Sequence, residues 1–159
     1  MAGESGSSSL PNRRVRNVMI GNKSRDTKPE MAIRRAVHAL GLRYRVAIRP
    51  EPALRRTADL VFTRARVAVF VDGCFWHGCD SHYVPSKTNA TYWDAKILSN
   101  VQRDRETDAA LERAGWSVIR VWSHEDVHLA AQSILYAVLA NRERLAQSPP
   151  APRTLDRDE

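Results

Sequence analysis

The sequence predicts one small α/β domain with a mixed central sheet. Apolar residues recur with helical or strand spacing in the order helix, strand, strand, strand, helix, strand, helix. Two strands follow one another closely enough to form a hairpin, while a long helix separates the last two. A hairpin makes antiparallel neighbours and a helical crossover makes parallel ones, so both pairings are expected in the sheet.

The domain is expected to span residues 13–140. Residues 1–12 are rich in Gly and Ser and are expected to be disordered, as are residues 141–159, which contain several prolines. Residues 13–28 are basic and are either a solvated tail or an arm that contacts DNA phosphates. The arm would include Arg13, Arg14 and Arg16.

The first helix is expected to begin at Thr27, because Thr27-Lys28-Pro29-Glu30 has the spacing of a capping box with proline in the first turn. It is expected to end at Gly41 and to bury Ile33, Ala36, Val37 and Leu40. Alternating apolar residues then predict a strand over 42–48. A basic connection over 49–57 contains two prolines and three arginines.

Residues 58–63 and 66–71 form two apolar runs separated by Arg64 and Ala65, which predicts a hairpin. Their near-continuous Val, Leu and Phe content indicates central strands. A long helix is expected from a cap at Asn89 to about Ala114, with its buried side marked by Trp93, Ile97, Val101 and Leu111.

The last two elements follow Gly115. Residues 116–122 read as a strand, and Ser123 with Asp126 can cap a final helix. The apolar stripe of that helix is expected to comprise Val127, Ala130, Ile134, Ala137 and Val138.

The formal net charge of +7 indicates a polyanionic partner, because a concentrated positive field attracts phosphates. No apolar run is long enough for a membrane helix, and no signal peptide is recognisable. The chain is therefore expected to be cytoplasmic. In a reducing compartment, Cys74 and Cys79 are better explained as metal ligands or structural thiols than as a disulfide.

Cys74, Cys79, His82 and His124 form a possible zinc-binding set. Four protein ligands around zinc leave no place for water, so such a site would be structural. His77 lies inside the same stretch and competes for the role. The alternative is two buried free thiols and two surface histidines.

A catalytic site is expected where Asp59 opens one strand of the hairpin and Asp72 ends the other, since the hairpin would bring the two carboxylates together. Paired carboxylates bind Mg²⁺. His77 could act as general base, because its ordinary pKa lies near neutral pH. The alternative is that both aspartates cap turns and that His77 is a neighbour of the thiols.

The chain closely resembles the very short patch repair endonucleases over residues 13–140. The resemblance rests on Asp59, on residues 71–79 (Val-Asp-Gly-Cys-Phe-Trp-His-Gly-Cys), on residues 100–104 (Asn-Val-Gln-Arg-Asp), and on the pairs Gly115-Trp116 and Val121-Trp122. It implies the core of type II restriction endonucleases (PD-(D/E)xK type) with a structural zinc. It further implies Mg²⁺-dependent nicking of one strand beside a T:G mismatch left by deamination of 5-methylcytosine.

The resemblance also implies roles for individual residues. Asp59 and the main-chain oxygen of Val71 would bind Mg²⁺, with Glu30 close by, and His77 would activate water. Asp72 stands where the best-studied member has histidine, and a carboxylate there should also bind Mg²⁺. Residues implied to contact DNA are Phe75, Trp76 and Trp93, as rings that wedge into the base stack, and Lys96 and Asn100 on a helix surface.

The zinc ligands depart from the best-studied pattern of three cysteines and one histidine. Here His82 would replace one ligand with a shift of one residue, and His124 would replace a cysteine, and both are competent zinc ligands. The protein is expected to be a bacterial, nucleoid-associated monomer that acts on mismatched duplex DNA, with other mismatch-repair proteins as further partners. The alternatives are a nuclease with broader mismatch or unmodified-duplex specificity, and a non-catalytic, zinc-stapled DNA-binding module.

Overall fold

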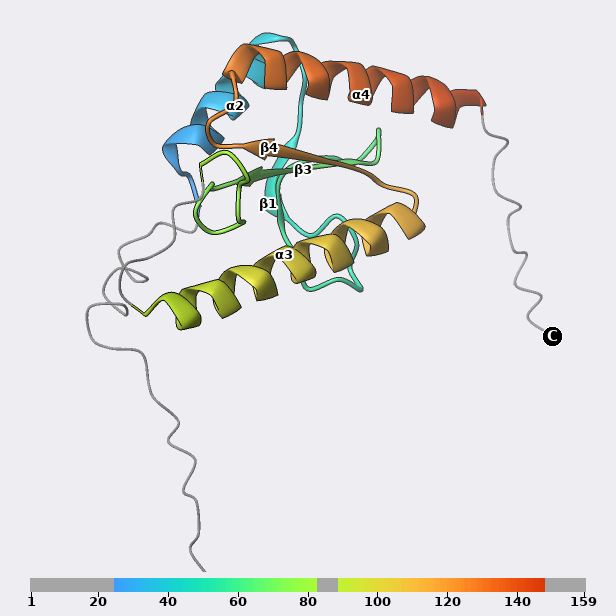
Figure 1. The fold of residues 1–159 in the computed structure, drawn as a ribbon. Coiled ribbons are helices and arrows are strands. Elements are labelled where there is room, and N and C mark those ends of the chain that lie inside the picture. The colour runs from blue at the N-terminus through green and yellow to red at the C-terminus, as the bar shows by residue number, and fades with distance from the viewer. Residues whose placement is uncertain (1–24, 83–88, 148–159) are drawn as a thin grey trace, which may run out of the picture.

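The computed structural model describes residues 25–82 and 89–147, which form a four-stranded sheet with helices on both faces (Figure 1). The predicted tail over 1–12, residues 13–24 of the basic arm and the end of the chain over 148–159 lie outside the described residues. The elements in chain order are α2 (Lys28–Ala39), β1 (Arg45–Ile48), β2 (Ala58–Phe62), β3 (Val67–Asp72), α3 (Ala90–Arg113), β4 (Ser117–Trp122) and α4 (Val127–Gln147).

The sheet is mixed, as predicted, and its strands lie in the order β1-β2-β3-β4. β2 pairs antiparallel with both β1 and β3, and β3 pairs parallel with β4. The predicted hairpin and the predicted crossover through α3 account for these two kinds of pairing. Because the hairpin strands occupy the centre of the sheet, both of their faces are covered, which explains their near-continuous apolar sequence.

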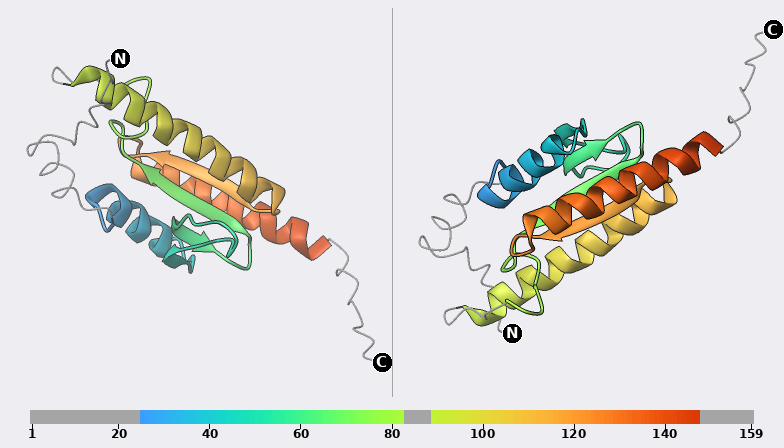
Figure 2. Two further views of the ribbon diagram at one scale, coloured as in Figure 1. Left: turned by 90° about the horizontal axis from the view of Figure 1, so that it is seen from below. Right: turned by 90° about the horizontal axis from the view of Figure 1, so that it is seen from above.

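Two cores lie on opposite faces of the sheet. In Figure 2, α2 and α4 cover one face and α3 covers the other. Leu60 and Phe62 of β2 point to the α2/α4 side, whereas Val61 between them points to the α3 side. The helices contribute Ile33, Val37, Ile134 and Val138 to the first core and Leu111 to the second.

The capping box at the start of α2 is confirmed. The Thr27 hydroxyl accepts a hydrogen bond from the Glu30 amide (3.5 Å), and the Glu30 carboxylate accepts from the Thr27 hydroxyl (3.0 Å) and the Asp26 amide (2.8 Å). After Leu40 the chain turns at Gly41, whose φ of 80° is easily reached only by glycine. The cap therefore also holds Glu30 in a fixed, buried position.

Several helix and strand boundaries in the structure differ from those predicted from the sequence. β1 begins only at Arg45, and the side-chain hydroxyl of the preceding Tyr44 donates a hydrogen bond to the Arg34 carbonyl on α2 (2.8 Å). Asn89 precedes α3 but makes no side-chain capping bond. Asp126 alone caps α4, accepting from the amides of His128 and Leu129 (2.9 Å each).

The prediction that the chain is disordered from residue 141 is wrong for residues 141–147, because α4 continues to Gln147. Asn141 is buried and donates to the Ala65 carbonyl (3.1 Å) and the Ser117 hydroxyl (2.8 Å). These bonds attach the helix to the β2–β3 turn and to the start of β4. None of the described helices has the length and apolar character needed to cross a membrane.

Candidate active site and metal cluster

The hairpin brings Asp59 and Asp72 to the same end of the sheet, as predicted. Asp59 Oδ2 accepts a hydrogen bond from the amide of Val71 (2.7 Å), directly beside Asp72. A cleft of about 340 Å³ opens there. It is lined by Glu30, Arg56, Thr57, Asp59, Phe70, Val71, Asp72, His77, Arg103, Asp104, Thr107 and Arg120.

Asp59 carries its negative charge at a free-energy cost in this cleft. The pKa of its carboxyl group is raised to about 6. Burial is the main cause and the charges of Glu30 and Asp72 also raise the pKa, while the Val71 hydrogen bond and the positive charge of Arg34 lower it. A cation between these carboxylates would relieve both the burial cost and the repulsion. The donor set is therefore suited to a divalent metal with oxygen ligands.

Glu30 reaches the cleft from the first turn of α2. Its carboxylate forms a buried ion pair with Arg34 (3.1 Å), which in turn contacts Asp26 (2.5 Å). Glu30 therefore stands beside Asp59 in an orientation fixed by its neighbours on the same helix. Both residues line the cleft.

His77 faces the cleft and contacts two carboxylates. Its Nδ1 lies 2.6 Å from Asp104 Oδ2 and 3.6 Å from Asp72 Oδ1. Burial lowers the pKa of His77, but the hydrogen bond to Asp104 and the two negative charges outweigh burial, so the net pKa is raised. With Nδ1 bonded to Asp104, Nε2 is the ring atom that can accept a proton in the cleft.

Arg120 on β4 connects three carboxylates around this site. Its guanidinium contacts Asp72 (2.7 Å), Asp108 (2.8 and 2.9 Å) and Asp104 (3.5 Å), and it lies over the ring of Phe70 (4.8 Å to the centroid). These contacts leave it fully engaged with protein groups. Arg120 therefore fixes the carboxylates and is not free to bind a substrate phosphate.

Sequence reasoning missed the parts played by Asp104, Asp108 and Arg120. Asp104 is the last residue of the Asn-Val-Gln-Arg-Asp motif, but no role was predicted for it. It follows Asn100 by four residues and so shares its helix face. That spacing was the available signal. Nothing in the local sequence distinguishes Arg120 from the many other arginines, because its partners lie on β3 and α3.

The four predicted metal ligands lie together. One ligand atom from each of Cys74, Cys79, His82 and His124 falls within 4.8 Å of every other. The sulfur-to-nitrogen distances include 3.0 Å (Cys74 to His124), 3.7 Å (Cys79 to His82) and 3.8 Å (Cys79 to His124). Ligand atoms around tetrahedral zinc lie roughly 3.5 Å apart, so the spacing suits such an ion.

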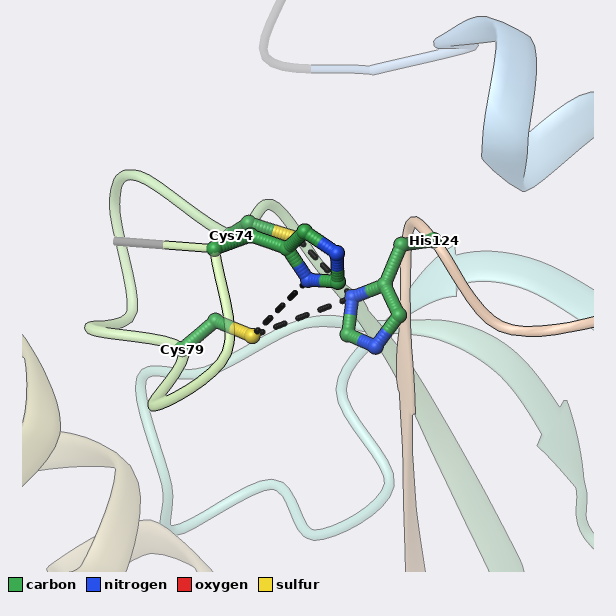
Figure 3. A group of neighbouring side chains, drawn as sticks. Cys74, Cys79 and His124 are labelled. Atoms are coloured by element: carbon green, nitrogen blue, oxygen red, sulfur yellow. Dashed lines mark hydrogen bonds between the residues drawn. The ribbon is translucent and has the colours of Figure 1, made fainter. Parts of the chain in front are cut away.

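The cluster joins two segments that are distant in sequence. Figure 3 shows the two cysteines on the loop after β3 and His124 between β4 and α4, all pointing toward a common centre. Cys79 is buried, Cys74 is partly buried and both histidines are exposed. His77 lines the cleft, so His82 and not His77 is the histidine of this loop that joins the cluster.

Gly78 allows the loop to pass closely over α3. It has a φ of 63°, and a Cβ atom there would lie 3.1 Å from Ile97 Cγ2. Within the same loop, the amides of Trp76 and His77 both donate to the Gly73 carbonyl (3.1 and 3.2 Å). This compact turn directs His77 to the cleft while its cysteines face the cluster.

The aromatic residues predicted to contact DNA form one group. The rings of Phe75, Trp76 and Trp93 lie 5.2–5.6 Å apart in edge-to-face contacts. Trp93 is buried, whereas Phe75 and Trp76 are partly buried. Phe75 and Trp76 thus rest on Trp93 and keep part of their surface accessible.

The two polar residues predicted on the DNA-facing surface of α3 differ in position. Lys96 is exposed. Asn100 is 6% exposed and donates to the Trp76 carbonyl (2.8 Å), while its own oxygen accepts from Arg103 (2.6 Å). Its predicted place on an outer surface is therefore wrong, because it bonds the aromatic loop to α3.

The family model described as DNA mismatch endonuclease Vsr matches residues 9–83. The chain is 44% identical to the type II nicking enzyme V.NaeI of Lentzea aerocolonigenes, over 77% of this chain and 74% of that protein. It is 43% identical to the type II nicking enzyme V.NmeDIP of Neisseria meningitidis serogroup C (69% and 73% covered) and 36% identical to the DNA mismatch endonuclease Vsr of Escherichia coli strain K12 (62% of each).

Proposed function

The chain belongs to the Vsr family of DNA endonucleases, and we propose that it uses Mg²⁺ to nick one strand of duplex DNA beside a T:G mismatch. Such mismatches arise by deamination of 5-methylcytosine, and the nick would initiate very short patch repair. The protein would have the restriction-endonuclease core implied by the family and would act as a monomer. Other proteins would carry out the later repair steps. The observation that carries it is the cleft in which Asp59 and Asp72 meet beside His77.

Asp59, Asp72 and the main-chain oxygen of Val71 would hold the Mg²⁺ ion, with Glu30 close by. The residues fit the ion, because the unfavourable charge of partly buried Asp59 needs a cation nearby. Asp72 would offer Oδ1, since Arg120 already binds Oδ2. When bound, Mg²⁺ supplies stabilisation of the negative charge that develops on the reacting phosphodiester.

His77 would take the proton from the attacking water through Nε2. Asp104 holds Nδ1 at 2.6 Å and so orients the ring and favours the tautomer that leaves Nε2 unprotonated. Asp104 itself stays ionised: burial raises its pKa, but the His77 hydrogen bond and the positive charge of Arg120 outweigh burial and lower it. These contacts give His77 the geometry of a general base.

Zinc bound by Cys74, Cys79, His82 and His124 would be structural, because the four protein ligands leave no open position. The ion would attach the loop that carries His77 and the aromatic rings to the corner between β4 and α4. Phe75 and Trp76 would then stack on bases at the mismatch, where a poorly stacked wobble pair is easier to open. Loop position and mismatch recognition would thus depend on the same cluster.

The proposal is tested with end-labelled T:G and fully matched duplexes, with and without Mg²⁺. We expect a nick in one strand of the T:G duplex only, and only with Mg²⁺. Asp59→Ala should abolish nicking while leaving DNA binding largely intact, and His77→Ala should slow single-turnover nicking by a factor on the order of 10². Equal nicking of both duplexes would replace the mismatch assignment with the broader nuclease, and no nicking by the parent protein would favour the DNA-binding module.

A further inference from the structure

A second pocket, of about 380 Å³, lies at the opposite end of the β2–β3 hairpin from the cleft. We call it the arginine pocket, because its charged lining residues are Arg43, Arg45, Arg64 and Arg142. No acidic side chain lines it. None of the four arginines forms an ion pair with a carboxylate among the described residues.

This arrangement contrasts with the interior arginines. Arg34 and Arg120 are each paired with two or more carboxylates, which balance their charge. In the arginine pocket, four positive charges converge without such partners and repel one another. A guanidinium group binds the oxygens of a phosphate with two parallel hydrogen bonds, so a phosphate is an occupant that would remove this repulsion.

The catalytic cleft cannot by itself attract the DNA backbone strongly. Its lining residues include four carboxylates but only three arginines, and Arg120 is already engaged with three of the protein's aspartates. Most of the affinity for DNA must therefore come from positive charge outside the cleft.

β1 leads from the arginine pocket to the cleft. Arg45 lies opposite Val61 at the pocket end, and Ile48 lies opposite Ala58 at the cleft end. The connection that follows carries exposed Arg49 and Arg55 and then Arg56, which lines the cleft. Because β1 is an edge strand of the described sheet, a strip of exposed arginines joins the two sites along that edge.

We propose that duplex DNA leaving the cleft runs along β1 and places a backbone phosphate in the arginine pocket. This inference rests on the proposed function. Asp72 in the cleft and Val67 are five residues apart along β3, which corresponds to roughly 17 Å, and Val67 pairs with Phe62, which lines the arginine pocket. A duplex rises about 3.4 Å per base pair, so the pocket reaches a phosphate about 5 base pairs from the nick.

The test is a set of T:G duplexes that extend from about 3 to about 12 base pairs beyond the mismatch, on one side or the other, with affinity measured without Mg²⁺. For the parent protein we expect affinity to rise about tenfold when one particular side passes about 5 base pairs. Arg64→Ala/Arg142→Ala should remove this step and lower the slope of log affinity against log salt by about one. Arg113→Ala/Arg144→Ala, which removes the same charge from exposed positions outside the pocket, should keep the length step.

The inference is overturned if the pocket variant keeps both the length step and the salt slope, or if both double variants lose the step equally. It is also overturned if a glutamate-rich peptide binds the pocket while duplex length has no effect on affinity. The pocket variant should nick the shortest duplex at the parental rate, because the pocket takes no part in the chemistry. If no duplex is nicked even by the parent, the proposed function fails, while the metal-free length dependence still decides the DNA path.

Discussion

Asp104 on α3 and His77 on the loop after β3 meet through a 2.6 Å contact between a carboxylate oxygen and Nδ1. The two residues are separated by 27 positions, so only the packing of α3 against the loop brings them together. Three residues spread over about two turns of the helix contribute to this packing: Ile97 beneath Gly78, Asn100 at the Trp76 carbonyl and Asp104 at His77.

Replacing Asp104 with Asn should slow nicking by a factor on the order of 10², because His77 loses the partner that orients it. His77 must be unprotonated to act as a base, so its raised pKa places the acidic limb of the rate profile above pH 6.5. Removal of the Asp104 charge should move that limb to lower pH. Single-turnover rates between pH 5.5 and 8.5 measure both effects.

Asp108→Asn is the matched control, because Asp108 contacts Arg120 and not His77. Asp108→Asn should leave the pH of the acidic limb of the rate profile nearly unchanged. A parental rate and limb position in Asp104→Asn would show that His77 does not depend on Asp104.

Replacing Asp59 with Asn should stabilise the metal-free protein at pH 8. The folded-state pKa of about 6 exceeds the ordinary value of 3.8, so ionised Asp59 destabilises the fold above pH 6, and this penalty disappears as the pH falls below 4. The gain at pH 8 should be on the order of 1–3 kcal/mol and should vanish at pH 4.

Thermal unfolding of parent and Asp59→Asn in EDTA measures this difference. Added Mg²⁺ should raise the melting temperature of the parent much more than that of the variant. Equal stability of the two proteins at pH 8 would mean that the surroundings of Asp59 do not destabilise its ionised form.

The purified protein should contain one zinc ion per chain, detected by metal analysis. Strong chelation or Cys79→Ser should lower the melting temperature, because a closed zinc site contributes its binding energy to folding. Asp80→Ala is the control, since Asp80 is exposed in the same loop and lies outside the cluster. Well-folded protein without zinc, or equal melting of Cys79→Ser and the parent, would contradict a structural metal.

Trp76→Ala should weaken binding to a T:G duplex more than to a matched duplex, by roughly 1–3 kcal/mol, since the ring would stack on an exposed base. Its melting temperature should change little, because Trp76 is only partly buried. Trp93→Ala is the comparison: this ring is 6% exposed, so its loss should mainly destabilise the protein. Equal losses on both duplexes for Trp76→Ala would assign mismatch recognition to other residues.

The sequence predicted the order of elements and the mixed sheet because each element carries a local pattern. The capping box at Thr27 and Glu30 involves residues three positions apart, and the hairpin joins runs that are nearly adjacent. The cleft and the metal cluster were predictable for a similar reason. Most of the residues predicted for them lie within the 13 consecutive positions 70–82, and Asp59 lies on β2, which pairs with β3.

Residues whose role depends on distant partners could not be predicted in this way. Arg120 reaches Asp72 only because β4 pairs with β3 in a register that places Arg120 beside Phe70. Asn100 and Asn141 are polar residues on long helices, which ordinarily indicates an exposed face, yet each donates to a carbonyl on another segment. Such partners become known only when the elements are packed together.

The two kinds of strand pairing also set an expected order of folding. The hairpin closes through neighbours such as Phe62 and Val67, whereas β3 meets β4 through pairs such as Val67 and Ser117, which are 50 positions apart. Closing the longer loop costs more chain entropy, so β4 should join after the hairpin has formed. Substitutions in the hairpin core should therefore slow refolding, while those at β4 should mainly speed unfolding. Asp59 and Asp72 would meet before Arg120 arrives to pair with Asp72.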